Sequence, residues 1–111
     1  MSRSPKDFLG HIAVETAFII DVSKRSSKSE FVDDPVLTRA IVRSLEVIGE
    51  ATKNLPNSLK KQYPEIPWRQ MAGMRDKLIH QYFGVDYDIV WDIVTEEIPA
   101  LHARIRTIVE Q

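Results

Sequence analysis

Hydrophobic residues recur at helical spacing from the start of the chain and predict a first amphipathic helix. Residues three or four positions apart are neighbours on an α-helix. The face built this way carries Phe8, Ile12, Thr16 and Ile19. Ser4 followed by Pro5 is typical of a helix start, so we expect this helix to run from Pro5 to about Lys24. The polar, serine-rich stretch from Ser23 to Ser29 then indicates a loop.

The same spacing predicts a second helix, which Asp33-Asp34-Pro35 begins and Pro56 ends. Its apolar stripe consists of Leu37, Ile41, Leu45, Ile48, Ala51 and Leu55. Phe31, just before this helix, could anchor a short turn. Gly49 lies in mid-helix, where glycine costs about 1 kcal/mol relative to alanine. This position therefore indicates either a close helix crossing, a close approach of a ligand, or a tolerated glycine.

Proline and glycine divide the second half of the chain into shorter helical segments. We expect a helical turn from Asn57 to Tyr63, and a helix from Pro67 that Gly73 kinks or breaks before the segment 74–82. Asp86 caps the last helix, and Gly84 is a natural stop before it. Pro99 should kink that helix near Thr95 or Glu96, because proline removes a backbone donor. The stripe expected on it runs through Ile89, Ile93, Glu97, Pro99-Ala100, Arg104 and Ile108, with Val90, Trp91, Val94, Leu101 and Ile105 beside it.

No segment alternates with the period of two that marks a β-strand, so the predicted fold class is all-α. We expect an up-and-down bundle of four main helices plus short helical turns, formed by residues 1–111 as a single domain.

Hydrophobic residues make up 43% and charged residues 28% of the chain, which excludes global disorder. The sequence contains no cysteine, which excludes disulfides and thiolate sites and fits a reducing cytoplasm. No apolar run is long enough for a membrane span.

The net charge of -1 conceals a separation of charge along the chain. The segment 53–77 contains Lys53, Lys60, Lys61, Arg69, Arg75 and Lys77 against two acidic residues. The segment 85–111 contains Asp86, Asp88, Asp92, Glu96, Glu97 and Glu110 against two arginines. A protein that binds nucleic acid over its whole surface is usually basic overall. This chain could bind phosphates only locally, or both segments could simply be solvated faces.

The segment 74–83 contains the side chains with the clearest catalytic chemistry. Arg75 can bind a phosphate through two parallel hydrogen bonds, His80 can transfer protons near neutral pH, and Tyr82 adds a phenol. On a straight α-helix, Arg75 and His80 are roughly 140° apart, so they do not converge. Asp76 lies one turn before His80 and could accept its ring N–H. Either the helix unwinds, or two copies of the motif meet in a dimer, or the segment is an ordinary helix end.

Two further residues could support such a site. Lys77 lies inside the motif, and Glu50 directly after Gly49 could pair with a basic residue of a neighbouring helix or face solvent. His11 and Glu15 are four residues apart and could provide half of the ligands of a metal site, but no further ligand with suitable spacing supports them. We therefore expect no metal and no cofactor.

The motif Arg75-Asp76-x-x-x-His80-x-Tyr82 resembles that of the HEPN superfamily, and its HepT-like branch in particular. The resemblance extends over roughly residues 35 to 100. The matching segments are Ile48-Gly49-Glu50-Ala51, Pro64-Glu65-Ile66-Pro67-Trp68, Gly73-Met74-Arg75, Tyr82-Phe83-x-Val85-Asp86 and Ile89-Val90-Trp91. Asp76 stands where this branch often has asparagine, and its carboxylate would raise the basicity of His80 but repel RNA phosphate.

The resemblance implies a helical homodimer in which two motifs face one cleft. It also implies a metal-independent endoribonuclease that acts as the toxin of a type VII-like toxin–antitoxin pair. Arg75 and His80 would carry out the cleavage of RNA, with Asp76 orienting His80. The implied partner is a minimal nucleotidyltransferase antitoxin, which would transfer AMP from ATP to Tyr82. The main alternative is a non-catalytic binding subunit of a nucleotidyltransferase complex, and a third is a plain helical dimerisation module.

Overall fold

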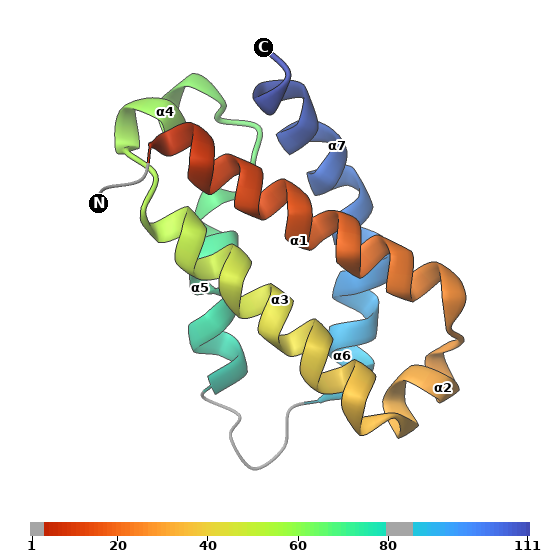
Figure 1. Cartoon of the computed structure of the whole chain (residues 1–111). Helices are drawn as coiled ribbons and strands as arrows, with labels where there is room; N and C mark the ends of the chain where they lie inside the picture. Colours follow the sequence, from red (N-terminus) through yellow and green to blue (C-terminus); the bar gives the residue numbers. More distant parts are fainter. Residues whose placement is uncertain (1–3, 80–85) are drawn as a thin grey trace.

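The computed structural model describes residues 4–79 and 86–111, and these residues form a helical bundle (Figure 1). Its elements are α1 (Pro5–Arg25), α2 (Lys28–Asp33), α3 (Pro35–Lys53), α4 (Asn57–Gln62), α5 (Trp68–Ile79), α6 (Tyr87–Asp92), the π-helical turn η1 (Ile93–Glu97) and α7 (Ile98–Val109). The described part of the chain contains no β-strand, so the all-α prediction is confirmed.

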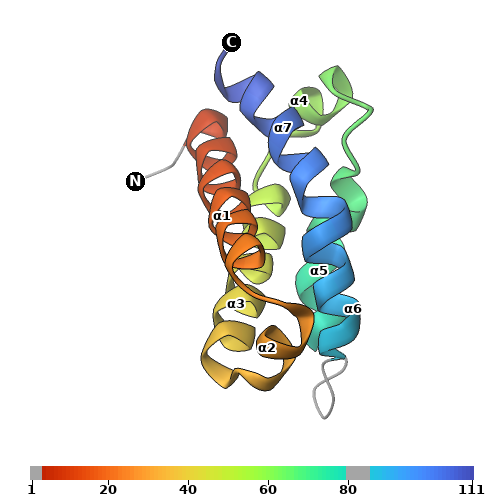
Figure 2. The ribbon, with the colours of Figure 1, turned by 90° about the vertical axis from the view of Figure 1, so that its right-hand side faces the viewer.

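The long helices run alternately up and down the bundle (Figures 1 and 2). The helix α3 packs against α1 on one side and α5 on the other, and α1 also packs against α7. The short helices α2 and α4 lie at opposite ends of the bundle, as both views show. The segments α6, η1 and α7 follow one another directly and return the chain along α1.

Side-chain caps start the helices at the predicted places. The Ser4 hydroxyl accepts from the Asp7 amide, and the Asp7 carboxylate accepts from the Ser4 amide, which completes a capping box before α1. Asp34 Oδ1 accepts from the amides of Val36 and Leu37 at the start of α3. Such caps satisfy amide groups that have no partner within the helix.

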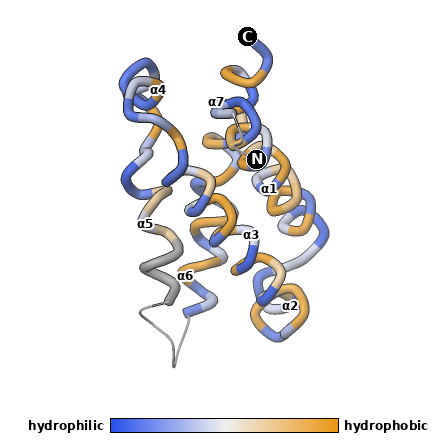
Figure 3. Tube along the Cα trace, turned by 60° about the vertical axis from the view of Figure 1, so that its left-hand side comes forward, coloured by the Kyte–Doolittle hydropathy of each residue, from blue (hydrophilic) through white to orange (hydrophobic). Residues whose placement is uncertain are grey.

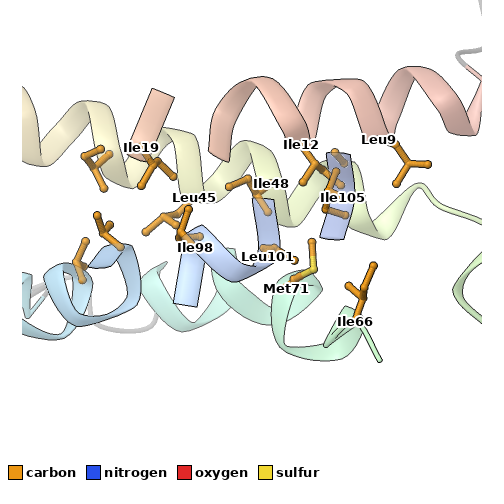
Figure 4. Packing of buried hydrophobic residues seen from close by; sticks show 14 of the residues in the cluster. Leu9, Ile12, Ile19, Leu45, Ile48, Ile66, Met71, Ile98, Leu101 and Ile105 are labelled. Carbon is orange, nitrogen blue, oxygen red and sulfur yellow. The ribbon is translucent and has the colours of Figure 1, made fainter. Parts of the chain in front are cut away.

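The core lies between α1, α3, α5 and α7 (Figure 4). Its largest fully buried aliphatic side chains are Ile12, Ile19, Ile41, Leu45, Ile48, Met71, Ile98 and Ile105. Burying one such side chain contributes about 1.5–3 kcal/mol, so this cluster is the main source of stability. Figure 3 shows α4 as largely hydrophilic, in agreement with the absence of buried residues in that short helix.

The predicted loop from Ser23 to Ser29 is wrong over most of its length. The helix α1 continues to Arg25 and α2 already begins at Lys28. Ser27 starts α2 with a second capping box, in which it exchanges hydrogen bonds with Glu30. The side chain of Phe31 is completely buried, and its ring centroid lies 5.3 Å from that of Trp91. Phe31 therefore anchors this segment, but the segment is the short helix α2 and not the expected turn.

Pro99 interrupts the last helix where the sequence predicts it. The interruption takes the form of the π-helical turn η1, in which the Ile98 amide donates to the carbonyl of Ile93, five residues earlier. Proline has no amide hydrogen and its ring clashes with the carbonyl four residues before it, so the turn before Pro99 widens. The predicted apolar stripe is wrong. The buried positions are Val90, Val94, Ile98, Leu101 and Ile105, whereas Ile89 and Glu97 are exposed.

Candidate functional site

The structure describes the predicted catalytic segment only in part. Arg75, Asp76 and Lys77 occupy helical backbone positions in the second half of α5, which ends at Ile79. Their side chains lie outside the described residues, as do His80 and Tyr82 as a whole. The predicted divergence of Arg75 and His80 and the predicted stop at Gly84 therefore also lie outside the described residues.

The start of α5 is fixed by a network of hydrogen bonds. The indole N–H of Trp68 donates to the carbonyl oxygens of Lys60 and Tyr63, at 3.1 and 3.0 Å. The Trp68 amide donates to the Ile66 carbonyl at 2.8 Å, and Ile66 itself is buried. These contacts tie the first turn of α5 to the end of α4.

The turn just before α5 is also held by α7 and by the C-terminal residue. Arg104 on α7 donates to the carbonyl oxygen of Glu65 at 3.0 Å. The Tyr63 hydroxyl donates to Gln111 at 2.8 Å. No local pattern in the sequence predicts these two contacts, because they join residues 39 and 48 positions apart. Through them, α7 and the C-terminal end brace the turn from which α5 starts.

Beyond its first turn, α5 packs on the core. Met71 is buried, and Met74, the residue before Arg75, is half-buried. A narrow groove of about 120 Å³ runs between α5 and the start of α7. It is lined by Pro67, Gln70, Met71, Met74, Glu97, Ile98 and Leu101. The backbone of the motif thus continues a helix that is anchored at its start and packed along its length.

Gly73 does not kink or break α5, so that prediction is wrong. The helix is continuous from Trp68 to Ile79, and Gly73 has no positive φ. A Cβ atom at Gly73 would meet nothing within 4 Å. Gly49, by contrast, is buried in α3.

Glu50 has an exposed side chain on α3. It lines a shallow groove of about 210 Å³ between α1 and α3, together with Phe8, His11, Arg43, Val47, Ala51 and Asn54. The Asn54 side-chain amide donates to the Glu50 backbone carbonyl at 2.8 Å. Glu50 therefore lies at the α1–α3 surface, in a groove with both apolar and polar lining residues.

His102 is half-buried on α7, where it contacts α1. Its Nδ1 lies 2.7 Å from the hydroxyl of the buried Thr16. Burial lowers the pKa of His102, and the nearby charge of Arg106 lowers it further. A groove of about 620 Å³ adjoins this contact and is lined by α1 residues together with Thr95, Pro99 and His102.

Among the described residues, no group of three or more histidine, aspartate or glutamate side chains is placed to hold a metal ion. The His11–Glu15 pair considered from its spacing belongs to no such group. Glu15 instead accepts a 2.6 Å hydrogen bond from Ser44, which joins α1 to α3. None of the described helices has the length and apolar character needed to cross a membrane.

Comparison with known proteins gives one consistent family. The model of the family described as ribonuclease HepT-like matches residues 12–108. A protein of Caldanaerobacter subterraneus subsp. tengcongensis, whose name describes it as a candidate RNase, is 50% identical over 109 residues, or 98% of this chain and 97% of that protein. A protein of Thermococcus cleftensis, named as a probable ribonuclease HepT, is 48% identical over 104 residues, or 94% of each chain.

A third relative, from Methanocaldococcus jannaschii, is also named as a candidate RNase. It is 46% identical over 97 residues, which cover 87% of this chain and 80% of that protein. No solved structure matches this chain. The matched regions include all of α3 and α5, the helices that carry or contact the predicted motif.

Proposed function

Because the chain belongs to the ribonuclease HepT-like family, we propose that it is a metal-independent endoribonuclease. In this proposal it acts in the cytoplasm as the toxin of a type VII-like toxin–antitoxin pair. The observation that carries the proposal is the motif Arg75-Asp76-x-x-x-His80-x-Tyr82 within the matched region. The position of α5 supports the proposal. The first half of the motif lies near the end of this helix, whose start is held by hydrogen bonds to α4 and from α7.

The proposed reaction is an internal transfer at phosphorus. The ribose 2′-oxygen attacks the adjacent phosphorus and loses its proton, while the bond from phosphorus to the 5′-oxygen breaks. His80 takes the proton from the 2′-hydroxyl or returns one to the leaving 5′-oxygen. Arg75 stabilises the negative charge that develops on the phosphoryl oxygens. The products are a 2′,3′-cyclic phosphate and a free 5′-hydroxyl.

The other candidate residues have supporting roles in this proposal. Asp76 accepts the ring N–H of His80, fixes its tautomer and raises its basicity. Lys77 adds positive charge near the RNA backbone. Glu50 lines the groove between α1 and α3, away from α5, so any support it gives to the site is indirect, through the packing of α3. Asp76 also places a carboxylate near RNA phosphate, which should make cleavage slower than with asparagine at this position.

We further propose that the active unit is a homodimer. On a straight helix Arg75 and His80 are roughly 140° apart, so one copy would not direct both side chains at the same phosphate. Two copies related by a twofold axis could supply Arg75 and His80 to a shared cleft. Each motif would then be incomplete without the other.

Regulation in this proposal acts on Tyr82. A minimal nucleotidyltransferase would join the Tyr82 phenol oxygen to the α-phosphorus of ATP and release pyrophosphate. The attached AMP adds a bulky anion to the cleft, so it blocks RNA by its size and by like-charge repulsion. The chain itself needs no cofactor for cleavage.

The alternative is a non-catalytic binding subunit of a nucleotidyltransferase complex. The net charge of -1 and the carboxylate of Asp76 favour it, since both oppose RNA binding. In this alternative, the motif serves for docking or for presentation of Tyr82. The two functions share the partner and differ in whether RNA is cut.

A cleavage assay in the presence of a chelator tests the proposal. Wild type should cut RNA to 2′,3′-cyclic phosphate ends and leave a matched 2′-deoxy substrate intact. His80→Ala and Arg75→Ala should abolish cleavage while circular dichroism and size-exclusion elution stay unchanged. Cleavage that survives both substitutions would come from a contaminant, and a wild type inactive on RNA would favour the binding subunit.

A further inference from the structure

One face of α6 and η1 exposes apolar and acidic side chains together. Ile89, Asp92 and Ile93 follow the spacing of one helix face, and Glu96 continues it into η1. Ile89 is 44% exposed, Ile93 is half-buried, and Asp92 and Glu96 are exposed. Other sides of this segment pack on α2, α1 and α7. We call these four residues the α6 face.

Negative charge dominates the surroundings of the α6 face. The exposed carboxylates of α2, α6, η1 and the α6 cap are Glu30, Asp33, Asp86, Asp88, Asp92, Glu96 and Glu97. Lys28 pairs with Asp88 at 3.4 Å. Within the described part of the chain, the carboxylates of Asp92 and Glu96 have no ion-pair partner. The surface therefore attracts cations and repels RNA phosphates.

Three cations lie near this surface. Lys24 and Arg25 are exposed at the end of α1, where Lys24 lines a groove together with Thr95 of η1, and Lys28 is the residue paired with Asp88. Lys53, Lys61 and Arg69 are exposed farther away, at the end of α3, in α4 and at the start of α5. The helices α4 and α6 lie toward opposite ends of the bundle (Figures 1 and 2). Among the described residues, the seven carboxylates around the α6 face thus outnumber the neighbouring cations Lys24, Arg25 and Lys28.

Chain length places the α6 face within reach of the proposed modification site. The helix α6 begins at Tyr87, five residues after Tyr82. Five residues span at most about 18 Å when fully extended. A partner seated on α6 is therefore bound within a few residues of Tyr82 along the chain.

We propose that the α6 face docks a protein with a cationic surface, and that this protein is the nucleotidyltransferase that modifies Tyr82. The inference rests on the proposed function, since it names the surface through which that partner binds. Ile89 and Ile93 supply the apolar centre of the contact, and the carboxylates around them supply a charged rim. Attraction between the rim and lysine or arginine side chains of the partner accelerates association and makes it sensitive to salt.

Two other occupants fit the face less well. RNA carries a phosphate charge on every nucleotide, and it would meet unpaired carboxylates here. A second copy related by a twofold axis through the face would set Asp92 and Glu96 against the same residues of the other copy. Like charges held close together oppose that association.

A binding experiment with matched charge changes tests the inference. The probe is the purified cognate nucleotidyltransferase without ATP, and the dissociation constant is measured at low and high salt. The test variants are Asp92→Lys with Glu96→Lys, and Ile89→Ser separately. The control is Asp21→Lys with Glu110→Lys, which changes the charge by the same amount at two exposed ion-paired positions on α1 and the end of α7.

We expect the double variant of the α6 face to weaken binding at least tenfold and to reduce its salt dependence. Ile89→Ser should weaken binding with the salt dependence kept, and the control should bind within threefold of wild type. Equal weakening by both double variants would overturn the inference, because the effect would then follow net charge alone. The inference would also be overturned if the α6 variants changed the homodimer equilibrium without weakening partner binding, or if they lost RNA binding.

The outcomes also separate this inference from the proposed function. If wild type binds the partner and receives AMP while the α6 variants bind equally well, the docking surface is wrong and the function stands. If wild type cuts RNA but does not bind the partner at either salt concentration, both the docking surface and the regulation proposed at Tyr82 are wrong, and the nuclease remains.

Discussion

The indole N–H of Trp68 donates to the carbonyl oxygens of both Lys60 and Tyr63, at 3.1 and 3.0 Å. This contact joins the first residue of α5 to the end of α4. Arg104 holds the same turn from α7 through the Glu65 carbonyl. Since Arg75 follows Trp68 by seven residues on one continuous helix, these contacts set the position from which the motif extends.

We predict that Trp68→Phe lowers both stability and the proposed cleavage activity. Phenylalanine keeps an aromatic ring but has no donor for the two carbonyl groups. The unfolding free energy should fall by about 1–3 kcal/mol, as for two lost hydrogen bonds at a part-buried site. The kcat for RNA cleavage should fall about tenfold with little change in KM, because a small displacement of catalytic groups slows the chemical step. Chemical denaturation and steady-state kinetics measure the two effects.

Trp91→Phe is the matched control. Trp91 is half-buried and its ring packs beside that of Phe31 on α2, away from the start of α5. This variant should lose stability with kcat close to that of wild type. If both tryptophan variants reduce kcat to the same extent, Trp68 acts through overall stability and not through the position of α5.

Gly73→Ala should stabilise the protein. Gly73 lies within α5 without a positive φ, and an added Cβ would meet nothing within 4 Å. Alanine restricts the unfolded chain more than glycine does, so we expect a gain of about 0.5–1 kcal/mol. Gly10 in α1 has the same open surroundings, and Gly10→Ala should give a similar gain. A Tm that falls for Gly73→Ala but rises for Gly10→Ala would show that a second chain occupies the space beside Gly73.

The contact between His102 and Thr16 predicts a dependence of stability on pH. Burial, and then the charge of Arg106, lowers the pKa of His102 below its usual value of 6.5. The unfolded chain therefore binds this proton more readily than the folded chain. Stability from this group is present above about pH 6.5 and is lost as the pH falls toward the folded pKa.

Denaturant midpoints between pH 5.5 and 7.5 measure this effect in wild type and in His102→Asn. Asparagine can keep a polar contact with the Thr16 hydroxyl but does not titrate in this range. The difference in unfolding free energy between the two proteins should change across this range and level off above it. Parallel pH profiles for the two proteins would rule out His102 as the source.

Much of the fold could be predicted from the sequence, since its signals are local. Ser4 and Asp34 cap the helices they were expected to cap, and the stripe through Ile41, Leu45 and Ile48 is buried. The predictions failed where local and tertiary effects compete. Ser23 to Ser29 is polar enough for a loop, yet Ser27 and Glu30 form a capping box that starts α2.

The apolar stripe of the last helix failed for a different reason. Two stripes at helical spacing run side by side through this segment, one through Ile89 and Ile93 and one through Val90 and Val94. The second is the buried one, and local spacing alone does not distinguish them. No local sequence pattern predicts the hydrogen bonds of Trp68 and Arg104, because each needs backbone carbonyls that only the folded chain brings near.

At the motif itself, only the backbone of positions 75–79 is described, and the roles of Arg75 and His80 stay predictions.

Tyr82→Phe should separate catalysis from its control. The substitution removes the phenol oxygen that would receive AMP, but it leaves His80 and Arg75 in place. In cells that also produce the nucleotidyltransferase, we expect wild type to gain the mass of one or more AMP groups and to lose its toxicity. The Tyr82→Phe protein should keep its unmodified mass and stay toxic. Tyr87→Phe serves as the control for a lost hydroxyl near the motif, and it should be modified and neutralised like wild type. If Tyr82→Phe is neutralised without a change in mass, the partner acts by binding alone, and the α6 variants would then abolish protection directly.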